Sequence, residues 1–467
     1  MKVKSIPSSW ISRDGLRLDC NPYMSGALEA WIRLEKLVCN KERLADLTKG
    51  HDGGIYNGPH FSRNYVEDAE HGVQFLGSSS MLQADLGNLP YLRRKDAESP
   101  KLSYLKIQPG MTLISCSGTI GRMVYARPDM SEMWSSQHIM KVVPDDEKIP
   151  SGYLYAFLSS KFGVPLVTSG TYGSIIQSIE PEHIAGLPVP RLGEIEEEVN
   201  LLVEDAASLR TRASQILLSA VHELENQSNL DKLTPPNSPT PFSCVSVRST
   251  TVQERFDAFF HSPYGNQVVE QLKAGMNDTT TIGELALTIV EPNRFKRIRV
   301  EDPNHGVRFF GTSALMWSEP IEMYFLPKSQ QGMHQYIVTE QTVLIPRSGQ
   351  LSGIIGSAVL PYGSILGSAV SEDAIRINCG DSTTAGYVFV ALSSQYGLRQ
   401  LKARAYGSSI PHLDVHQIGR VVVPDLGAEG RCRIGELGSK VSQLRNTAVE
   451  KEREARTIVE RAIEEAP

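Results

Sequence analysis

One stretch of this chain occurs twice, and the duplication constrains the fold more than any other feature of the sequence. Residues 67–77 return at 301–311, each with a His-Gly-Val step, and the two copies lie 234 residues apart. Matches in the same register continue as far as Pro190 and Pro424. Solenoid repeats are only roughly 20–50 residues long, so this period indicates a duplicated domain. We expect a protein with two like domains to bind a target that has two halves.

The composition is typical of a globular protein without a structural metal or disulfides. A chain of 467 residues can form roughly two to four domains with full cores. Its six cysteines include no Cys-x-x-Cys pair, which argues against zinc and favours a reducing cytoplasm. Residues 1–7 lack the apolar core of a signal peptide. We therefore expect a cytoplasmic protein.

One segment has a membrane-like composition. No charge falls between Arg347 and Glu372, and the interval is rich in Gly, Ile, Leu and Val. Pro361 interrupts it, and the matching part of the first copy carries charges such as Arg122 and Asp129. Because equivalent segments of a duplicated domain share a fold, we expect two buried strands around a Pro-Tyr-Gly-Ser turn and not a membrane span.

The charge distribution leaves a nucleic-acid partner open. A net charge of −6 argues mildly against one. The segment 193–226 contains eight acidic and two basic residues, however, and so accounts for the whole of that charge. The rest of the chain is neutral and leaves room for a basic face on each copy.

Each copy ends in a long helical pattern, which we place at 193–228 and 429–467. Apolar residues recur there at steps of three and four, the spacing of a heptad seam. A helix packed on its own domain would show the same pattern, but two helices of similar length favour packing against each other. The residues expected at this contact are Val199, Leu202, Leu209, Ile216, Ile434, Leu437, Val441, Leu444 and Ile458.

A linker joins the first helix to the second copy. Residues 229–251 include the proline-rich run 234–241, which has little to bury. Such a linker lets the second copy lie at the far end of the helix pair. Antiparallel helices would then place two globular domains at opposite ends, related by an approximate two-fold axis.

Within each copy the pattern predicts short strands and turns with a few helices. Strands are expected at 111–115 and 138–143 and at their counterparts in the second copy, 342–346 and 375–377. Helices are expected at 153–161 and 387–395. Each copy is therefore predicted to be an α+β domain with a twisted sheet and long loops.

The sequence offers no convincing catalytic or metal site. No phosphate-binding Gly-rich motif and no His-Glu-x-x-His occurs. Asn21-Pro22-Tyr23 resembles the base-holding motif of amino-methyltransferases but lacks one proline, and no Gly-rich turn for a methyl donor accompanies it. His412 and His416 have helical spacing, which is more typical of a turn or core than of a metal site.

Two polar loops recur in both copies and are the better candidates for binding. Residues 117–122 match 347–351, and residues 169–177 match 403–410. Glycine allows close approach of the backbone to another surface, while Ser, Thr, Gln and Arg can bond base edges or phosphates. A structural turn shared by both copies explains the repeated Tyr-Gly-Ser equally well.

Basic runs at 93–95 and 294–299 could neutralise phosphates. Taken singly, each run is more typical of a solvated face. The candidate DNA-binding residues in the loops and basic runs are Arg94, Ser117, Thr119, Arg122, Tyr172, Ser174, Gln177, Arg297, Arg347, Ser348, Gln350, Arg404, Tyr406 and Ser408.

The order of these repeated elements resembles the DNA specificity (S) subunit of Type I restriction–modification systems, over nearly the whole chain. Singly the elements are weak, but the same order given twice is fairly specific. The start of each helix departs from the usual Pro-Pro-Leu-x-Glu-Gln of that family. The matching elements are Arg17-Leu18-Asp19 with Arg255-Phe256-Asp257, residues 113–121 with 344–349, residues 152–158, Tyr172-Gly173-Ser174, and residues 184–190 leading into a helix.

The resemblance implies an α+β fold with two tandem target-recognition domains, joined by two long antiparallel coiled-coil helices with pseudo-two-fold symmetry. Each domain would read half of a split DNA site, and the helices would act as spacer. The implied segments are a recognition domain at 1–192, a spacer helix at 193–228, a linker at 229–251, a second recognition domain at 252–428 and a second spacer helix at 429–467.

The resemblance also implies the partners. Two methyltransferase (M) subunits would dock on the helices, and restriction–translocation (R) subunits would complete the assembly, with no membrane contact. This chain would then hold no cofactor and no catalytic residue. The M subunits would use S-adenosylmethionine, and restriction would use ATP with magnesium. Two alternatives stay open: a two-lobed interaction scaffold of a related defence complex without DNA readout, and a self-sufficient DNA-modifying enzyme.

Overall fold

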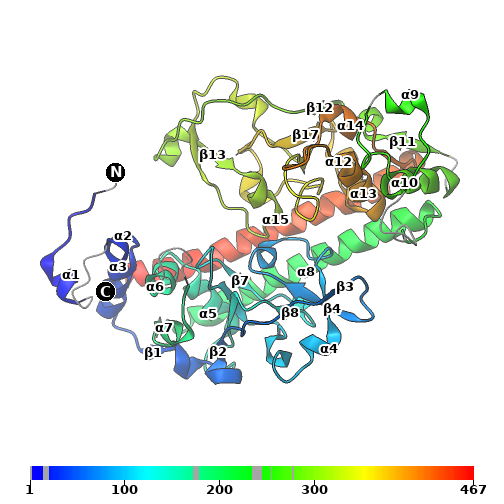
Figure 1. The fold of residues 1–467 in the computed structure, drawn as a ribbon. Coiled ribbons are helices and arrows are strands. Elements are labelled where there is room, and N and C mark those ends of the chain that lie inside the picture. Colours follow the sequence, from blue (N-terminus) through cyan, green and yellow to red (C-terminus); the bar gives the residue numbers. More distant parts are fainter. Residues whose placement is uncertain are drawn as a thin grey trace. The chain divides into compact units, whose positions relative to one another are not determined.

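The computed structural model describes residues 3–13, 20–171, 178–233, 244–253, 255–275 and 278–466 (Figure 1). The chain forms two compact units. Unit 1 extends to Thr211 and takes in the residues from Thr447 onward, and unit 2 is Arg212–Asn446. The sequence-based boundaries fall at the helix ends, whereas each compact unit contains part of both long helices.

Unit 1 contains two four-stranded sheets and a small strand pair. The first sheet has the order β2-β9-β6-β7, with every neighbour antiparallel. The second has the order β3-β5-β4-β8, in which β4 and β8 are parallel. The strands are β1 (Lys41–Arg43), β2 (Ile55–Tyr56), β3 (Tyr65–Val66), β4 (Gly72–Leu76), β5 (Tyr91–Arg93), β6 (Thr112–Ser115), β7 (Met123–Tyr125), β8 (Trp134–Ser135), β9 (Ile139–Val142) and β10 (Pro188–Pro190), the last pairing with β1.

Unit 2 repeats this topology with fewer strands. Its sheets have the orders β12-β17-β15 and β14-β13-β16, and β13 pairs with β16 in parallel as β4 does with β8. The duplicated sequence therefore forms the same α+β arrangement twice. The strands are β11 (Thr279–Thr281), β12 (Thr288–Val290), β13 (Gly306–Phe310), β14 (Tyr324–Pro327), β15 (Thr342–Pro346), β16 (Ala369–Val370), β17 (Ala374–Asn378) and β18 (Val422–Pro424), the last pairing with β11.

Shorter helices flank the sheets in each unit. Those of unit 1 are α1 (Ser8–Arg13), α2 (Asn21–Met24), α3 (Ala27–Lys36), α4 (Arg94–Ala97), α5 (Ser151–Leu158), α6 (Gly163–Ser169) and α7 (Pro181–Ala185). Those of unit 2 are α9 (Ser249–Val252), α10 (Pro263–Gly275), α11 (Ile282–Leu285), α12 (Ser382–Ser393), α13 (Gln395–Arg404) and α14 (Val415–Gly419).

The repeated Gly-Tyr pair joins a helix to the end of each repeat. The hydroxyls of Tyr153 and Tyr387 donate to the carbonyls of Pro190 and Pro424, at matching positions of the two copies. The preceding glycine lets α12 approach a long helix closely, because a Cβ on Gly386 would lie 2.1 Å from the carbonyl oxygen of Gly435. These pairs recur because each copy needs the same close helix contact.

The long helices α8 (Ile195–Gln227) and α15 (Gly427–Glu465) belong to both units. In unit 1 the start of α8 and the end of α15 enter one core, through Val199 and Val203 on one side and Val459 and Ile463 on the other. In unit 2 the end of α8 lies beside the start of α15, where Arg433 pairs with Glu223 at 2.9 Å.

The end of α15 is held by a residue from the other end of unit 1. Arg33 of α3 donates from Nε to the carbonyl of Ile463 (2.8 Å) and from Nη2 to the carbonyls of Glu464 (2.6 Å) and Ala466 (2.5 Å). A cation is favourable beside the free carbonyls of a helix C-terminus. Arg33 therefore caps α15 within unit 1.

The buried seam of these helices differs by one residue from the predicted one. Val199, Ile434, Val441 and Leu444 are buried, but the other predicted positions are half-buried. Valines and alanines, which allow a close helix approach, occupy several of the buried positions, together with Leu217 and Leu224. The half-buried predicted positions are Leu202, Leu209, Ile216, Leu437 and Ile458; on α8 the buried seam includes Val203, Ala206, Arg210, Ala213, Leu217, Ala220 and Leu224.

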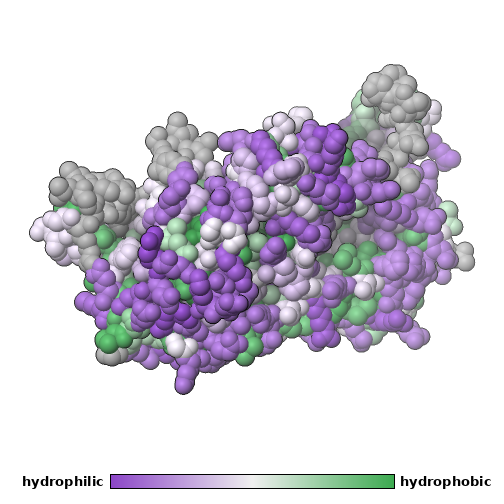
Figure 2. Space-filling view, turned by 90° about the horizontal axis from the view of Figure 1, so that it is seen from below, coloured by the Kyte–Doolittle hydropathy of each residue, from purple (hydrophilic) through white to green (hydrophobic). Residues whose placement is uncertain are grey.

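The uncharged segment of unit 2 is only partly strand. Of the two buried strands predicted between Arg347 and Glu372, one exists as the short β16, and the other is reduced to Val359, which forms a single bridge with Leu344. Pro361 is followed by a 3₁₀ turn at Gly363–Ile365. No helix in the described residues is long and apolar enough to cross a membrane. Hydrophilic side chains predominate on the face drawn in Figure 2.

Each unit buries a basic side chain at the same position of a central strand. Lys141 of β9 is fully buried; its Nζ donates to the carbonyl of Ile139 (2.9 Å) and lies 5.5 Å from the centroid of the Tyr56 ring. Burial lowers the pKa of Lys141 to about 7. Arg376 of β17 occupies the equivalent place, and burial lowers its pKa to about 10. Lys141 is therefore a core lysine that is only half charged near neutral pH.

The first prediction concerns Lys141. Its folded-state pKa is below its unfolded value, so the unfolded chain binds the extra proton between about pH 7 and pH 10.5. The stability of unit 1 should therefore rise with pH across this window, with a slope approaching about 1.4 kcal/mol per pH unit. Lys141→Met should stabilise the protein most at pH 6.5, and the gain should shrink towards pH 10, as measured by urea unfolding. Lys95→Met, at an exposed position, serves as control; an equal gain at every pH would contradict the prediction.

The second prediction concerns the glycine contact of α12 with α15. Alanine favours a helix over glycine by about 1 kcal/mol, so propensity alone predicts that Gly386→Ala is stabilising. The overlap with the Gly435 carbonyl reverses the sign, and we expect a net loss of about 1–3 kcal/mol in thermal unfolding. Gly419→Ala is the matched control, because its Cβ would meet nothing closer than Ile289 Cδ1 at 3.5 Å. A Gly386→Ala protein as stable as the wild type would rule out this close contact.

Candidate nucleic-acid interface

The two recurring polar loops of the second copy meet in unit 2. One follows β15 and contains residues 347–353; the other follows α13 and contains residues 405–413. Leu413 N donates to the carbonyl of Arg347 (2.8 Å), Gly349 N to that of Pro411 (3.1 Å), and Gln350 Nε2 to that of Ser409 (3.0 Å). Segments that are 60 residues apart in sequence thus form one surface.

The second loop is a small hairpin with an exposed tip. Tyr406 and His412 exchange both backbone hydrogen bonds, at 2.9 and 2.7 Å, and close the tip 407–411. Gly407 has φ +100°, a conformation that favours glycine. Ser348 Oγ bonds the Nδ1 of His412 (2.7 Å) and holds the hairpin to the first loop. The turn anticipated from Tyr-Gly-Ser is therefore present in the second copy, where it presents its polar residues to solvent.

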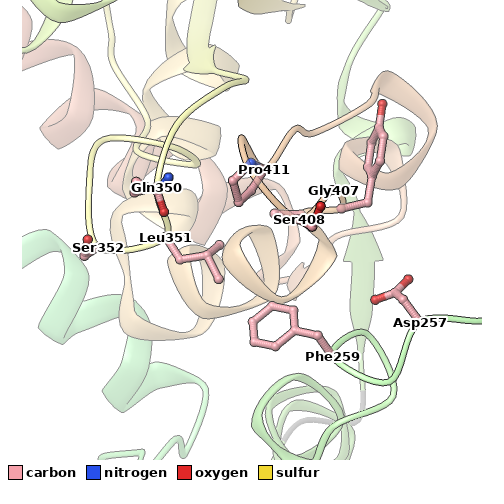
Figure 3. Close-up of a pocket in the computed structure, with 10 residues that line it drawn as sticks. Asp257, Phe259, Gln350, Leu351, Ser352, Gly407, Ser408 and Pro411 are labelled. Atoms are coloured by element: carbon pink, nitrogen blue, oxygen red, sulfur yellow. The ribbon is translucent and has the colours of Figure 1, made fainter.

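An open hollow of about 630 Å³ lies between these loops and the segment around Asp257 (Figure 3). Phe259 and Tyr406, each about 40% exposed, contribute aromatic surface. Amide and hydroxyl groups come from Gln350 and Ser408 on the two loops. An apolar wall with a few converging polar groups is typical of a recognition site. The lining is completed by Leu351, Ser352, Ala405, Gly407 and Pro411.

Arginines support this surface from within. Arg255 pairs with Asp257 (2.6 Å) and donates to the carbonyls of Arg404 and Ala405. Arg404 donates to the carbonyl of Arg420 (3.2 Å), and burial, with the charges of Arg255 and Arg420, lowers the pKa of Arg404 to about 10. These arginines brace the hairpin through hydrogen bonds to its backbone and to the segment around Arg420.

In unit 1 the base of the first loop is joined to Ser178 and Ile179, which follow the second loop in sequence. Ser117 forms a bridge with Ser178, as Ser348 does with His412, and Ile179 N donates to the carbonyl of Cys116 (3.0 Å). Gly118 and Thr119 are exposed at the tip of the first loop. The equivalence of the two bridges shows that the loop arrangement belongs to the duplicated fold.

The predicted binding residues fall into four groups. Thr119, Gln350, Tyr406 and Ser408 are exposed on the loops. Ser117, Arg122 and Ser348 are half-buried in them. Tyr172, Ser174 and Gln177 lie outside the described residues, as does the Arg17-Leu18-Asp19 element. The other four predicted residues, Arg94, Arg297, Arg347 and Arg404, bind groups of the protein itself.

Each of these four arginines contacts a group of the protein itself, and their binding to phosphates stays a prediction. Arg347 pairs with Glu291, and Arg297 with Glu372 at 2.7 Å. Arg94 donates to the carbonyl of Gly72 (2.9 Å). The physical reason is that each lies beside a sheet or helix with open carbonyls or a carboxylate, which a sequence run of charges does not reveal.

Sequence reasoning missed part of the surface. Phe259 lines the hollow, but no pattern links it to loops about 90 and 150 residues later. Asp257 had a signal, because it belongs to the repeated Arg-x-Asp element. Arg294 and Lys296 are exposed, and neither forms an ion pair with any described residue. They are better placed than Arg297 to attract a polyanion.

Two points remain, the methyltransferase-like motif and the possibility of a metal site. Asn21-Pro22-Tyr23 falls in the short helix α2, with Tyr23 buried. In the described part of the chain, no group of three or more His, Cys, Asp or Glu side chains could hold a metal ion.

Comparison with known proteins identifies similar solved structures. No protein-family model and no curated protein sequence matches the chain. The S subunit of a Type I restriction–modification system from M. genitalium is 12% identical, with 92% of this chain and 96% of that chain covered and a TM-score of 0.30. The HsdS subunit from Thermoanaerobacter tengcongensis is 14% identical, with 92% and 97% covered and a TM-score of 0.27.

A third chain, from a structure of a Type I restriction–modification system that concerns its assembly and conformational transition, is 15% identical, with 92% and 98% covered and a TM-score of 0.27. The chain is thus similar along more than 90% of its length to structures of Type I restriction–modification systems, among them S subunits.

Proposed function

We propose that this chain is the DNA specificity subunit of a Type I restriction–modification complex. Each unit reads one half of a split, asymmetric site, and α8 and α15 form an antiparallel pair that sets the distance between the halves. The observation that carries the proposal is a repeated bridge at the base of the loops: Ser117 pairs with Ser178 in unit 1, and Ser348 pairs with His412 in unit 2.

The loops have the chemistry that base readout needs. Gln350 and Ser408 offer donors and acceptors at the surface of unit 2, and Thr119 offers a hydroxyl in unit 1. Groups that specify sequence should differ between the copies, since the two half-sites differ, while groups that position the backbone can be shared. The first loop fits this division, because Ser117-Gly118 recurs as Ser348-Gly349 whereas Thr119 is replaced by Gln350. Tyr-Gly-Ser recurs in the second loop and so suits a role that both copies share.

The distribution of charge fits DNA on the loops and protein on the helices. Arg294 and Lys296 supply free positive charge near the loops of unit 2, and α8 begins with Glu196, Glu197 and Glu198. DNA would avoid such an acidic helix. The exposed leucines of α8, Leu201 and Leu218, suit a docked methyltransferase subunit.

Under this proposal the chemistry lies in partner subunits in the cytoplasm. Two methyltransferase subunits would use S-adenosylmethionine, and restriction subunits would use ATP with magnesium. This chain contributes recognition and geometry. Methyl transfer by the purified chain alone would instead favour the self-sufficient enzyme.

The test of the proposal is competition binding by the chain with its methyltransferase partner. Mapping methylated adenines in DNA from cells that carry the operon would supply the candidate site. A duplex with that site should compete at least about 1,000-fold better than random DNA at near-physiological salt. If no duplex competes better than random DNA, and assembly with the partner depends on neither DNA nor salt concentration, the chain is a protein scaffold.

A third prediction follows from the spacer. Inserting one heptad that preserves the seam at both unit boundaries, between Thr211 and Arg212 and between Asn446 and Thr447, lengthens each helix by about 10.5 Å at 1.5 Å per residue. The preferred spacer in the DNA should then grow by about three base pairs, with both half-sites unchanged. Binding to a panel of spacer lengths measures this. The same insertion in α8 alone, which mismatches the seam, should abolish tight binding at every length.

A fourth prediction distinguishes residues that read DNA bases from a residue that attracts the phosphate backbone. Gln350→Ala should relax sequence preference at one half-site by about 1–3 kcal/mol, and Thr119→Ala at the other half-site. Lys296→Ala should weaken binding to all sequences alike and reduce the salt slope by about 1. Competition against single-base variants of the site at several salt concentrations distinguishes these effects. Gln350→Ala and Thr119→Ala relaxing the same half-site would refute the assignment of one half to each unit.

A further inference from the structure

A pair of opposite charges is buried in the helix seam of unit 1. Arg210 of α8 binds Glu452 of α15 as a fork, with 2.9 Å between Nη2 and Oε2 and a second contact between Nη1 and Oε1. The two side chains are only 7% and 2% exposed. The neighbouring seam positions of α8, residues 203, 206, 213 and 217, are Val, Ala, Ala and Leu. The charges therefore interrupt an apolar seam.

A second pair connects the body of unit 1 to the same place. Arg127 and Asp129, just after β7, form a fork with distances of 2.9 and 3.0 Å, and Arg127 is only 1% exposed. Thr211 Oγ1, next to Arg210 on α8, donates to Asp129 Oδ1 (3.1 Å). Asp129 thus binds the body to the helix.

The two pairs act as one cluster. Burial opposes the charge of Glu452, but Arg210, Arg456 and Arg127 outweigh burial, so the pKa of Glu452 lies below its ordinary value. Arg127 therefore acts on Asp129 and on Glu452 alike. We call Arg127, Asp129, Arg210 and Glu452 the buried charge cluster.

Unit 2 makes the equivalent contact with neutral groups. Gly363, which begins the 3₁₀ turn equivalent to Pro128–Met130, donates its N–H to Asn446 Oδ1 of α15 (2.8 Å). Ser442 Oγ of α15 donates to the carbonyl of Pro361 (2.6 Å). Arg445 of α15 is buried at the same place, and its guanidinium carbon lies 5.8 Å from the centroid of the Tyr362 ring. Each unit is thus fixed to a long helix here, unit 1 through two ion pairs and unit 2 through neutral hydrogen bonds and a buried arginine.

The buried charge cluster tolerates little displacement. A buried ion pair adds little net stability, but separating it leaves unpaired charges at high cost. The fork geometry adds directionality. The exposed loop 117–122 runs directly into β7 (Met123–Tyr125), and Arg127 follows two residues later. A movement of the helices at the cluster would therefore move the base of the loop.

We propose that the buried charge cluster is a positioning joint, which fixes the pose of the loop at 117–122 on the helix pair and so restricts the DNA spacer to one length. The consequence for DNA rests on the proposed function, whereas the pose of the loop does not. The cluster acts through the loop and touches no DNA itself.

The decisive variant replaces the central pair by apolar residues. Arg210→Met with Glu452→Leu keeps volume in the seam, and such exchanges are often neutral or stabilising. The single change Glu452→Gln removes the buried carboxylate that Arg210 and Arg456 contact and is expected to lower the thermal midpoint sharply. The matched control is Asp205→Asn with Lys451→Gln, which removes an exposed ion pair of 3.2 Å between the same two helices.

The first readout needs no DNA. Spin labels are placed at Thr119 in the loop and at Glu454, an exposed position of α15, with Cys20, Cys39, Cys244 and Cys432 replaced by serine. The apolar double variant should keep its thermal midpoint but show a broader distance distribution than the wild type. The control variant should show the wild-type width. If the apolar variant shows the same width of the distance distribution as the wild type, the cluster does not fix the pose of the loop.

The second readout uses the complex with the methyltransferase partner and duplexes with the native spacer or one base pair more or less. The wild type and the control should prefer the native spacer, and the apolar variant should lose at least tenfold of that preference. If the apolar variant keeps the full preference for the native spacer, the cluster contributes only to packing. If the wild type binds no specific site, the proposed function fails, and the spin-label distances still decide whether the joint exists.

Discussion

The structure depends on the burial of two long helices by residues far away in the sequence. The core of unit 1 includes Val199 and Val203 from α8, but also Ala455, Val459 and Ile463, which come after the whole of unit 2. Neither copy of the repeat closes its core with its own residues. This shared burial explains why long helices, and not a simple linker, connect the two copies. Each long helix contributes residues to both units.

The close contacts around these helices explain which residues the two copies have in common. Tyr153 and Tyr387 satisfy the carbonyls at Pro190 and Pro424, and glycines at 152 and 386 admit the helices to contact. The loop residues face no such packing constraint. The copies therefore agree where chains must touch, whereas the exposed first loop differs between them, with Thr119 in one copy and Gln350 in the other.

Much of the fold follows from the sequence. The predicted helices at 193–228 and 429–467 correspond to α8 and α15 within two residues, because heptad periodicity over many turns is a strong signal. The seam was displaced by one residue at Leu202 and its equivalents, since hydrophobicity alone does not say that alanine and valine permit a closer helix approach. The short strands at 347–372 were overestimated, because apolar content does not distinguish a strand from a buried turn.

The candidate site was only partly predictable. The repeated Ser-Gly and Tyr-Gly-Ser loops pointed to Gln350, Tyr406 and Ser408, which are exposed on one surface. Charge runs were less informative: Arg347 and Arg297 are held by carboxylates distant in the sequence. Phe259 could not be predicted from the sequence, because only the tertiary fold brings it next to loops that lie far away in the chain.

The capping of α15 by Arg33 has a consequence for how the chain is made on the ribosome. Unit 2 is one continuous stretch, Arg212–Asn446, and can close as soon as it emerges. Unit 1 emerges earlier, but its core is complete only after residues 447–463 have been synthesised. Only then can Arg33 bind the carbonyls at the end of α15 and α15 cover the seam of α8. The half that is translated first is thus the half that matures last, and during that delay the bare apolar stripe of α8 is the part of the nascent chain most in need of a chaperone.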